Sequence, residues 1–395
     1  MASDTGSDRP RSAGPSRASG DSKRLLLLDI LRGVAALAVV VWHWQHFFYS
    51  SSEGRVVLPD LSVQPFYAAF WGLYELGDTA VDLFFTLSGF IFFRLYAEPV
   101  HRRRISARDF LVLRLSRLYP LHLATLLLVA ALQMVYRHSY DAFFVYSTND
   151  AYHFGLHLAF ASHWGFEQDH SFNAPIWSVS IEILLYALFF LVCRQKWFRP
   201  TDVVIIAAFA ALAGGTNLGR GLFSFYLGGG VFYLLNTVQA QRPGHQELVR
   251  RIAGWAAFAS LAVLWSGVHL QLVLVASTSL SQIAGRSLQL EFPTWGYLRT
   301  VVFPALIIFL GLSEEKAAHW SPRLAWLGDI TYSSYLLHFP LQLVVVLTIG
   351  SSLDFTSGVT MGGFLAALIA VSAASYHFFE RPVQGWLRGR LRSRG

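Results

Sequence analysis

Long apolar runs separated by short polar segments dominate the hydropathy pattern of this chain of 395 residues. An α-helix rises about 1.5 Å per residue, so a run of about 20 apolar residues matches the roughly 30 Å hydrocarbon core of a bilayer. The expected fold is therefore an all-α, polytopic integral membrane protein. The pattern predicts ten transmembrane helices, at residues 25–49, 66–96, 108–136, 173–194, 202–214, 222–238, 252–273, 295–312, 324–349 and 359–379.

A further apolar stretch, at residues 151–164, is shorter and carries three histidines. Its length suits a re-entrant or interfacial segment better than a helix across the bilayer. Basic residues test this count, because cytoplasmic loops of membrane proteins are enriched in Lys and Arg. The predicted cytoplasmic segments hold HRRR at 101–104, RQKWFR at 194–199, Arg242 with Arg250 and Arg251, Lys316 with Arg323, and the tail from Arg381. Outer loops and span ends keep few basic residues, among them Arg220 and Arg299, so both termini are predicted to be cytoplasmic.

The composition agrees with a membrane protein, since hydrophobic residues make up 54% of the chain and charged residues only 14%. The net charge of +7 comes from loops that orient the helices, so no nucleic-acid partner is expected. Cys193 is the single cysteine, which excludes a disulfide within the chain and a cysteine-rich metal site; no metal is expected. Residues 1–22 are predicted to be a disordered cytoplasmic tail, residues 23–385 the transmembrane domain, and residues 386–395 a basic cytoplasmic tail.

Ionisable residues inside the predicted helices are candidates for function, because a charge in hydrocarbon is costly unless it is paired. Arg32 and His43 lie 11 positions apart, about 16 Å along a helix and on nearly the same face. They form either a functional stripe or a snorkelling cation and an interfacial imidazole. Arg114 and Arg117, three positions apart, either anchor their helix in the cytoplasm or bind a phosphate or pyrophosphate group.

Polar residues of the second, ninth and tenth helices leave more than one interpretation open. Asp82 needs a partner, and Ser88, followed by a glycine, offers a small surface for another helix or for a ligand arm. His338 is equally compatible with a structural and a catalytic role. Glu380 is expected to pair with Arg381 or with a neighbouring loop.

The fourth helix places Ser178 and Glu182 four positions apart on one face, with Trp177 beside them. Glu182 must be protonated or paired at that depth, and Arg32 and His43 are its candidate partners. The sequence contains no P-loop, Rossmann glycine pattern, zinc-protease motif or nucleophile elbow. ATP-driven transport and serine-hydrolase chemistry therefore have no support.

Six segments, taken in order, resemble the membrane O-acyltransferases of acyltransferase family three. They are LDILRGVAALAVVVWHW, VDLFFTLSGFIFF, FLVLRLSRLYPLHL, IWSVSIEILLY, ITYSSYLLHFP and FFERP. The resemblance runs from about residue 24 to residue 385 and implies about ten transmembrane helices. It also implies transfer of an acyl group, usually acetyl from acetyl-CoA, onto a hydroxyl of a carbohydrate-containing acceptor. Such an acceptor is a surface polysaccharide, a glycolipid or a secreted glycosylated metabolite, and the protein would lie in the cytoplasmic (inner) membrane.

Residue roles follow from the same resemblance. His43 matches the essential histidine of the family, and Arg32, Arg114 and Arg117 match its essential arginines. The arginines are expected to bind the phosphates of CoA, and His43 to deprotonate the acceptor hydroxyl or to carry the acyl group transiently. Glu182 or Ser178 would orient His43. Four further residues are candidates for the lining of a channel that carries the thioester: Asp82, Ser88, Trp177 and His338.

A different class of protein fits the same residues. A proton-coupled transporter or flippase of a polyprenyl-linked or glycosylated substrate could use the intramembrane Arg, His and Glu side chains as a proton relay. The two classes differ in a simple property, because only the transferase consumes acetyl-CoA after extraction from the membrane. The sequence predicts no oligomeric state.

Overall fold

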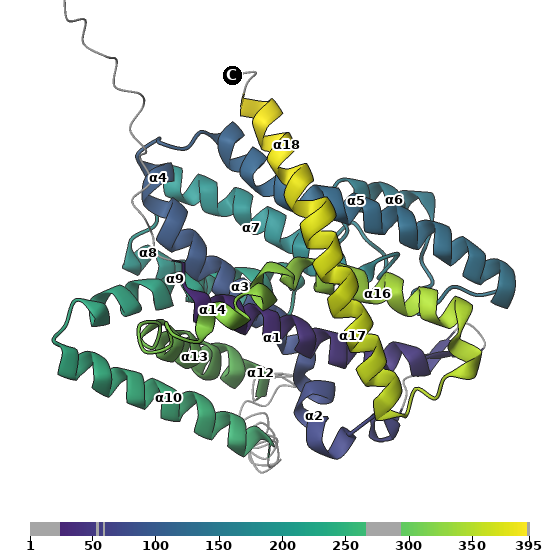
Figure 1. Cartoon of the computed structure of the whole chain (residues 1–395). Coiled ribbons are helices and arrows are strands. Elements are labelled where there is room, and N and C mark those ends of the chain that lie inside the picture. Colours follow the sequence, from purple (N-terminus) through teal and green to yellow (C-terminus); the bar gives the residue numbers. More distant parts are fainter. Residues whose placement is uncertain (1–23, 53–54, 58–59, 266–293, 393–395) are drawn as a thin grey trace, which may run out of the picture.

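The computed structural model describes residues 24–52, 55–57, 60–265 and 294–392 (Figure 1). The tail predicted for residues 1–22, the end of the helix predicted at 252–273 and the end of the tail predicted at 386–395 lie outside the described residues. Helices form nearly all of the described chain, and η marks a 3₁₀ or π-helical turn. The elements in chain order are α1 (Leu26–Trp42), η1 (His43–Phe48), β1 (Ser50–Ser52), β2 (Arg55–Val57), η2 (Leu61–Val63), α2 (Tyr67–Leu76), η3 (Gly77–Thr79), α3 (Ala80–Phe92), η4 (Phe93–Ala97), α4 (Glu98–His101), α5 (Ala107–Tyr140), α6 (Ala151–Leu158), η5 (Ala174–Ile176), α7 (Trp177–Arg194), α8 (Pro200–Leu212), α9 (Asn217–Gln239), α10 (Pro243–Trp265), α12 (Thr294–Tyr297), η6 (Leu298–Val302), α13 (Phe303–Gly311), α14 (Ser321–Leu324), α15 (Trp326–Asp329), α16 (Thr331–Thr348), η7 (Gly350–Ser352), α17 (Gly358–Ser375), η8 (Tyr376–Glu380) and α18 (Arg381–Arg392).

Many of these helices are long and apolar enough to cross a bilayer, as the hydropathy pattern predicted. An eighth span is added if Ser321–Asp329 and Thr331–Thr348, which meet at 50°, form one broken span. The seven uninterrupted candidates in the described chain are Leu26–Phe48, Tyr67–His101, Ala107–Tyr140, Ala174–Arg194, Asn217–Gln239, Pro243–Trp265 and Gly358–Arg390. The helical membrane architecture is therefore confirmed.

Two of the ten predicted spans coincide with shorter apolar helices, Pro200–Leu212 and Trp295–Gly311. With 13 residues, α8 is about 20 Å long, which is less than the thickness of the hydrocarbon core. The count of ten spans and the cytoplasmic position of both termini stay predictions. In the stretch 151–164 the helical part is α6, whose eight residues are too few to cross a bilayer.

The tightest crossing in the bundle joins α3 to α9, which pack together more extensively than any other pair of described elements. Glycines make the approach possible on both sides. A Cβ atom on Gly89 would lie 1.8 Å from the carbonyl oxygen of Phe225, and one on Gly228 would lie 1.9 Å from that of Thr86. The small surface predicted beside Ser88 is therefore a helix-packing surface at its glycine.

Helix α1 passes through the middle of the bundle and contacts α3, α13, α15 and α16 (Figure 1). Its start has no side-chain cap of its own, and instead Glu314 accepts hydrogen bonds from the backbone N–H groups of Leu26 and Leu27, at 3.1 and 2.9 Å. This carboxylate satisfies two of the donors that a helix start leaves unpaired. The start of α1 is therefore held by the segment that follows α13.

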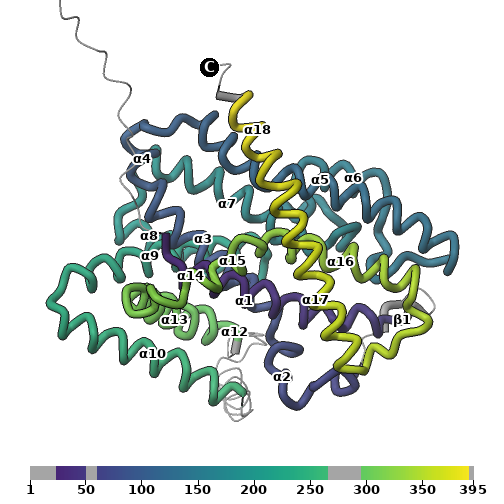
Figure 2. The backbone as a smooth tube through the Cα atoms, in the orientation of Figure 1, coloured from purple at the N-terminus to yellow at the C-terminus, as the bar shows by residue number. Residues whose placement is uncertain are grey.

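The C-terminal part of the chain is one long rod. Gly358–Arg390 runs without a break through α17, η8 and α18 and crosses the front of the bundle in Figure 2, where it is yellow. The segment predicted as a basic tail from residue 386 thus continues the helix to Arg392. The first part of α5 contacts α18, where Arg388 donates to the Ser116 hydroxyl.

Candidate active site

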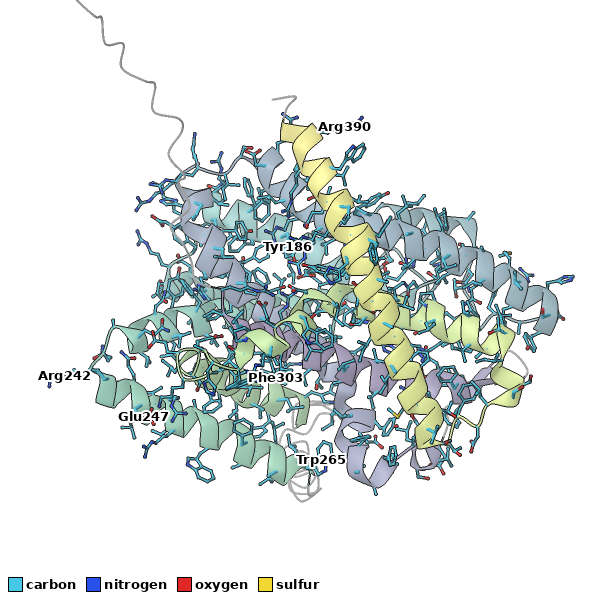
Figure 3. All side chains as sticks on the ribbon, in the orientation of Figure 1. Tyr186, Arg242, Glu247, Trp265, Phe303 and Arg390 are labelled. Carbon is cyan, nitrogen blue, oxygen red and sulfur yellow. The ribbon has the colours of Figure 1, made fainter. Side chains whose placement is uncertain are left out.

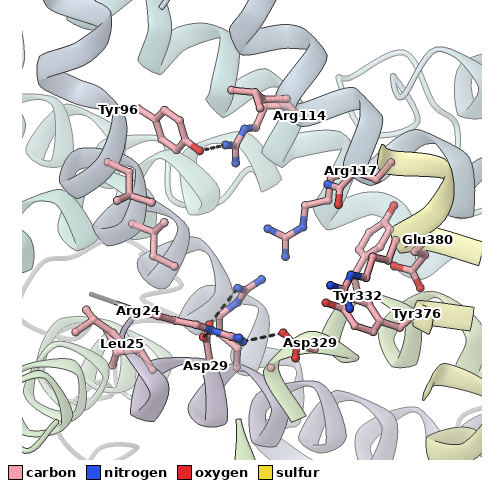
Figure 4. Close-up of a pocket in the computed structure, with 18 of the residues that line it drawn as sticks. Arg24, Leu25, Asp29, Tyr96, Arg114, Arg117, Asp329, Tyr332, Tyr376 and Glu380 are labelled. Carbon is pink, nitrogen blue, oxygen red and sulfur yellow. Dashed lines mark hydrogen bonds and ion pairs between the residues drawn. The ribbon is translucent and has the colours of Figure 1, made fainter. Parts of the chain in front are cut away.

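A cavity of about 410 Å³ opens where the start of α1 meets η4, the first turns of α5, the junction of α15 and α16, and α18 (Figure 4). We call it the cationic cavity, because seven arginines and three carboxylates line it. The arginines are Arg24, Arg32, Arg94, Arg114, Arg117, Arg381 and Arg388, and the carboxylates are Asp29, Asp329 and Glu380. Positive charge is in clear excess, so the cavity is suited to a ligand with several negative charges.

Two of the carboxylates are already engaged by one arginine. Arg24 donates to Asp29 and, at 2.7 Å, to Asp329, as the dashed lines of Figure 4 show. Arg32 lies 3.8 Å from the other oxygen of Asp29. Glu380 was expected to pair with Arg381 or with a neighbouring loop, and it accepts hydrogen bonds from the Ser333 and Ser375 hydroxyls. Arg117 and Arg381 therefore have no carboxylate partner among the described residues and can receive a ligand.

Arg114 and Arg117 occupy different environments in this cavity, although they are three positions apart. The Arg114 guanidinium lies 4.8 Å from the ring centre of Phe92 and 4.5 Å from that of Tyr96, and it donates to the Tyr96 hydroxyl. Arg117 points into the open centre of the cavity in Figure 4, and no hydrogen bond or ion pair to it is found among the described residues. Aromatic packing thus orients Arg114, while Arg117 is open to an anion.

A second cavity of about 110 Å³, the inner cavity, continues from the first. Arg32, Arg114 and Arg117 line both cavities and form the boundary between them. Arg32 and Arg114 are 82 positions apart in the sequence and meet here. The three arginines that were expected to bind the phosphates of CoA therefore lie together. Tyr186 is buried and lines the inner cavity with Ser88 and Glu182.

Glu182 accepts hydrogen bonds from the Ser88 and Tyr186 hydroxyls, and Arg32 lines the same inner cavity. Ser178 hydrogen-bonds Tyr335 at 2.8 Å, and the Tyr335 hydroxyl donates to a backbone carbonyl. Neither Glu182 nor Ser178 contacts His43 by a hydrogen bond, so the predicted direct orientation of His43 by these residues is wrong for this conformation. The reason is the fold of α16, which places Tyr335 between Ser178 and the histidines.

Beyond Tyr335 lies a group of three buried histidines, His43, His46 and His338. The ring of His43 is centred 4.7 Å from that of His338 and 4.7 Å from that of His46. Tyr335 belongs to the wall of the inner cavity and has its ring 6.1 Å from that of His338. The histidines therefore lie directly behind the end of the inner cavity, and His338 stands between that end and His43.

The protonation of these rings follows from their partners. Nδ1 of His43 lies 3.0 Å from the Val39 carbonyl oxygen, and Nδ1 of His338 lies 2.7 Å from that of Tyr335. A carbonyl can only accept, so Nδ1 carries the hydrogen in both rings and Nε2 has the free lone pair when the ring is neutral. The Nε2 atom of His338 is buried without a partner in the described structure. Both rings thus offer a base at Nε2.

Gln342 positions this group, although the sequence analysis did not single it out. Its amide nitrogen donates to the His43 carbonyl at 2.9 Å, and its oxygen lies 2.9 Å from Nδ1 of His46. The Tyr146 hydroxyl donates to the other nitrogen of His46 at 3.2 Å. A signal was present in the sequence, because Gln342 follows His338 by four positions and so shares its helix face.

Asp82 does not line either cavity, which corrects its prediction as a channel residue. Its carboxylate is fully buried and pairs with Arg220, at 2.8 Å, and with Arg299, at 3.1 Å. Both arginines lie near the starts of apolar helices, as expected for residues at span ends, and only 15% and 13% of their side chains are exposed because they pack against this acid. Trp177 is likewise outside the cavities and lies under Arg220, 5.4 Å from its guanidinium carbon. These residues form a structural ion cluster.

Three π-helical turns position polar residues in the cationic cavity and in the buried ion cluster. η4 carries Arg94 and Tyr96 into the cationic cavity, η8 carries Glu380 into the same cavity, and η6 carries Arg299 to the buried ion cluster. A π-turn inserts one residue into a helix and rotates the side chains that follow, and it occurs often at functional sites. Sequence periodicity gives no sign of such turns, because they interrupt the 3.6-residue repeat.

Comparison with known proteins identifies the family of the chain. The family model described as an acyltransferase domain matches residues 25–376. A Rhizobium radiobacter protein described as "Protein 2 in picA locus" is 35% identical over 109 residues, which are 28% of this chain and 46% of that protein. The chain thus covers about half the length of the relative that it matches. No solved structure gave a significant match. Because the model spans nearly the whole membrane domain, the chain belongs to acyltransferase family three.

Proposed function

We propose that the protein transfers an acyl group, acetyl in the first place, from acyl-CoA to a hydroxyl of a carbohydrate-containing acceptor. One observation carries the proposal: the cationic cavity continues past Arg32, Arg114 and Arg117 into an inner cavity whose wall includes Tyr335. The Tyr335 ring is centred 6.1 Å from that of His338, which in turn lies 4.7 Å from that of His43. The acceptor would be a surface polysaccharide, a glycolipid or a secreted glycosylated metabolite. The protein would act as a multi-pass protein of the cytoplasmic (inner) membrane.

The charges and sizes of the two cavities suit the two ends of an acyl-CoA. Arginine binds phosphate through two parallel N–H···O bonds, and the cationic cavity offers several guanidinium groups without a carboxylate partner. The smaller inner cavity suits a narrow chain such as the pantetheine arm. Ser88, Glu182 and Tyr186 would contact the amide groups of that arm. The thioester would then reach the end of the inner cavity at Tyr335.

The histidines supply the acid–base chemistry. In the proposed step, Nε2 of His43 accepts the proton of the acceptor hydroxyl while the hydroxyl oxygen attacks the thioester carbonyl carbon. A C–O bond forms, the C–S bond breaks, and the CoA thiolate takes up the proton from His43. The hydrogen bond from Nδ1 to Val39 keeps the ring in the tautomer that this step needs. Because His338 stands between the inner cavity and His43, it would contact the reacting groups or relay the proton.

A direct test uses protein purified in detergent, acetyl-CoA and a thiol reagent that reports release of CoA. We expect wild-type protein to consume acetyl-CoA when the acceptor is present, and His43→Ala to lose at least about 100-fold in rate, since general base catalysis contributes 10²–10⁴-fold. His245→Ala, at an exposed position of α10, is the matched control and should keep full activity. Full transfer by His43→Ala would refute the proposal. Substrate uptake without consumption of acetyl-CoA would favour the transporter instead.

The acceptor can be sought separately. Mass spectrometry of surface glycans and secreted metabolites, compared between a deletion strain and its parent, should show loss of a 42-dalton ester. The same comparison after complementation with His43→Ala should leave the ester absent. An ester that persists in the deletion strain would contradict a role for this chain in its formation.

A further inference from the structure

The last helix of the chain forms one wall of the cationic cavity, although the family match ends at residue 376. Arg381, Gln384 and Arg388 of α18 all line the cavity. We propose that α18 is part of the donor-binding site, with Arg381 binding a phosphate group of the donor and Arg388 holding the helix in place. This inference rests on the proposed function and adds a binding element to it.

The spacing of these residues directs them to the cavity. Arg381, Gln384 and Arg388 are separated by three and four positions, so they share one face of α18. Trp386 belongs to a different face, is 55% exposed, and packs against Arg390, whose guanidinium carbon lies 4.4 Å from the ring centre. Arg390 lies at the far end of α18 in Figure 3 and does not line the cavity. One face of α18 is thus a cavity wall, and another is solvent- or headgroup-facing.

Arg388 attaches this wall to the helix that carries the phosphate-binding candidates. Its Nε donates to the Ser116 hydroxyl at 3.2 Å, and its Nη2 donates to the Leu113 carbonyl at 3.4 Å. Both acceptors flank Arg114 in α5. Arg388 therefore fixes α18 relative to the arginine pair at the boundary of the two cavities, and it is a positioning residue.

Arg381 is placed to bind the ligand itself. The neighbouring carboxylate of Glu380 accepts from Ser333 and Ser375, at 3.0 Å for Ser375, so Glu380 is directed away from Arg381. Among the described residues, no ion pair to Arg381 is found, and its side chain is exposed at the cavity rim. None of the three histidines lines this cavity, and they lie behind the end of the inner cavity, so the phosphorylated end of an acyl-CoA would remain in the cationic cavity. Arg381 therefore meets a phosphate group, not the acyl chain.

The test measures KM and kcat for two donors, acetyl-CoA and acetyl-pantetheine, which lacks every phosphate. Arg381→Gln should raise KM for acetyl-CoA about tenfold or more, because a charge-assisted contact is lost, while kcat at saturation stays unchanged. KM for acetyl-pantetheine should not change. Arg388→Gln should also raise KM for acetyl-CoA, and Arg388→Lys should restore part of the affinity. Arg390→Gln, which removes the same charge from the same helix outside the cavity, is the control.

Several outcomes would overturn the inference: an unchanged KM for acetyl-CoA in Arg381→Gln, an equal rise for acetyl-pantetheine, or an equal rise in Arg390→Gln. Dephospho-CoA as a competitor distinguishes the 3′-phosphate from the diphosphate as the group bound. Thermal stabilisation by CoA is measured in parallel on all variants. If wild-type protein binds CoA and Arg381→Gln binds it equally well, α18 is excluded while the proposed function stands. If wild-type protein neither binds nor consumes CoA, both fail.

Discussion

Substitution of Gln342 by Leu tests whether the histidine group needs the amide bridge. Leu has a similar volume but no polar atom, so the change removes the hydrogen bonds to the His43 carbonyl and to Nδ1 of His46. Each buried group left without a partner costs about 1–3 kcal/mol. The two groups together would therefore destabilise the native arrangement by about 2–6 kcal/mol, or His43 and His46 would move to find other partners.

Displacement of His43 would lower catalysis, because a shift of about 1 Å in a catalytic group can cost 10²-fold in rate. We expect Gln342→Leu to lower kcat by about 10–100-fold, with KM for acetyl-CoA unchanged, since Gln342 lines neither of the cavities that the donor arginines line. The assay is release of CoA under saturating donor. Thermal unfolding of the purified protein measures the loss of stability in the same preparation.

Gln133 is a matched control for this experiment. It is also fully buried and also makes two hydrogen bonds, donating to the Phe144 carbonyl and accepting from the Phe144 N–H, both at 2.9 Å. Gln133→Leu should lower stability by a similar amount and leave kcat unchanged. If the two variants lose kcat equally, or if Gln342→Leu keeps full kcat, the amide bridge has no specific role in positioning His43.

Two further substitutions test the structure outside the cavities. Asp82→Ala removes the carboxylate shared by Arg220 and Arg299, leaves Asp78 as the remaining acidic partner of Arg220, and should destabilise the protein by about 3–5 kcal/mol in detergent unfolding. Glu247→Gln, in an ion cluster at the surface, should cost much less; equal losses would contradict a buried structural cluster. His163 lies between predicted spans, and burial lowers its pKa from 6.5 to about 3. Below pH 6.5 the unfolded chain therefore binds a proton at this residue more readily than the folded chain does. The free energy of unfolding decreases as the pH is lowered, by up to about 1.4 kcal/mol per pH unit. His163→Gln should therefore show a smaller difference in Tm between pH 7.5 and pH 5. An unchanged difference would exclude a contribution from this residue.

Much of the fold was predictable, because a span is a local property of the sequence. The predicted helix at 173–194 corresponds to Ala174–Arg194, and the one at 222–238 falls within α9. The prediction was wrong where a helix is formed by polar residues, because hydropathy does not reveal such a helix. The helix at 359–379 continues to Arg392, because α18 is stabilised by contacts with α5 that its polar sequence does not show. A polar helix has no hydrophobic run by which it could be recognised in the sequence.

Some features of the candidate site could likewise be predicted from the sequence, and others could not. Arg32, Arg114 and Arg117 could be chosen from the sequence, because a charge within an apolar run stands out, and the structure brings them together. Asp82 was equally conspicuous in the sequence, but it pairs with buried arginines and lines neither cavity. Its partner Arg220 is 138 positions away, and no local pattern joins the two.

The sequence alone determined that this chain is a helical membrane protein with charged residues inside its helices, since apolar length and burial cost act residue by residue along the chain. Only the tertiary structure decided which of those charges face a cavity and which pair with each other. The physical reason is that a buried charge is satisfied by whatever lies within about 4 Å of it. That neighbour is set by helix packing, by the glycine contact of α3 with α9, and by the π-turns that rotate Tyr96, Arg299 and Glu380 into place.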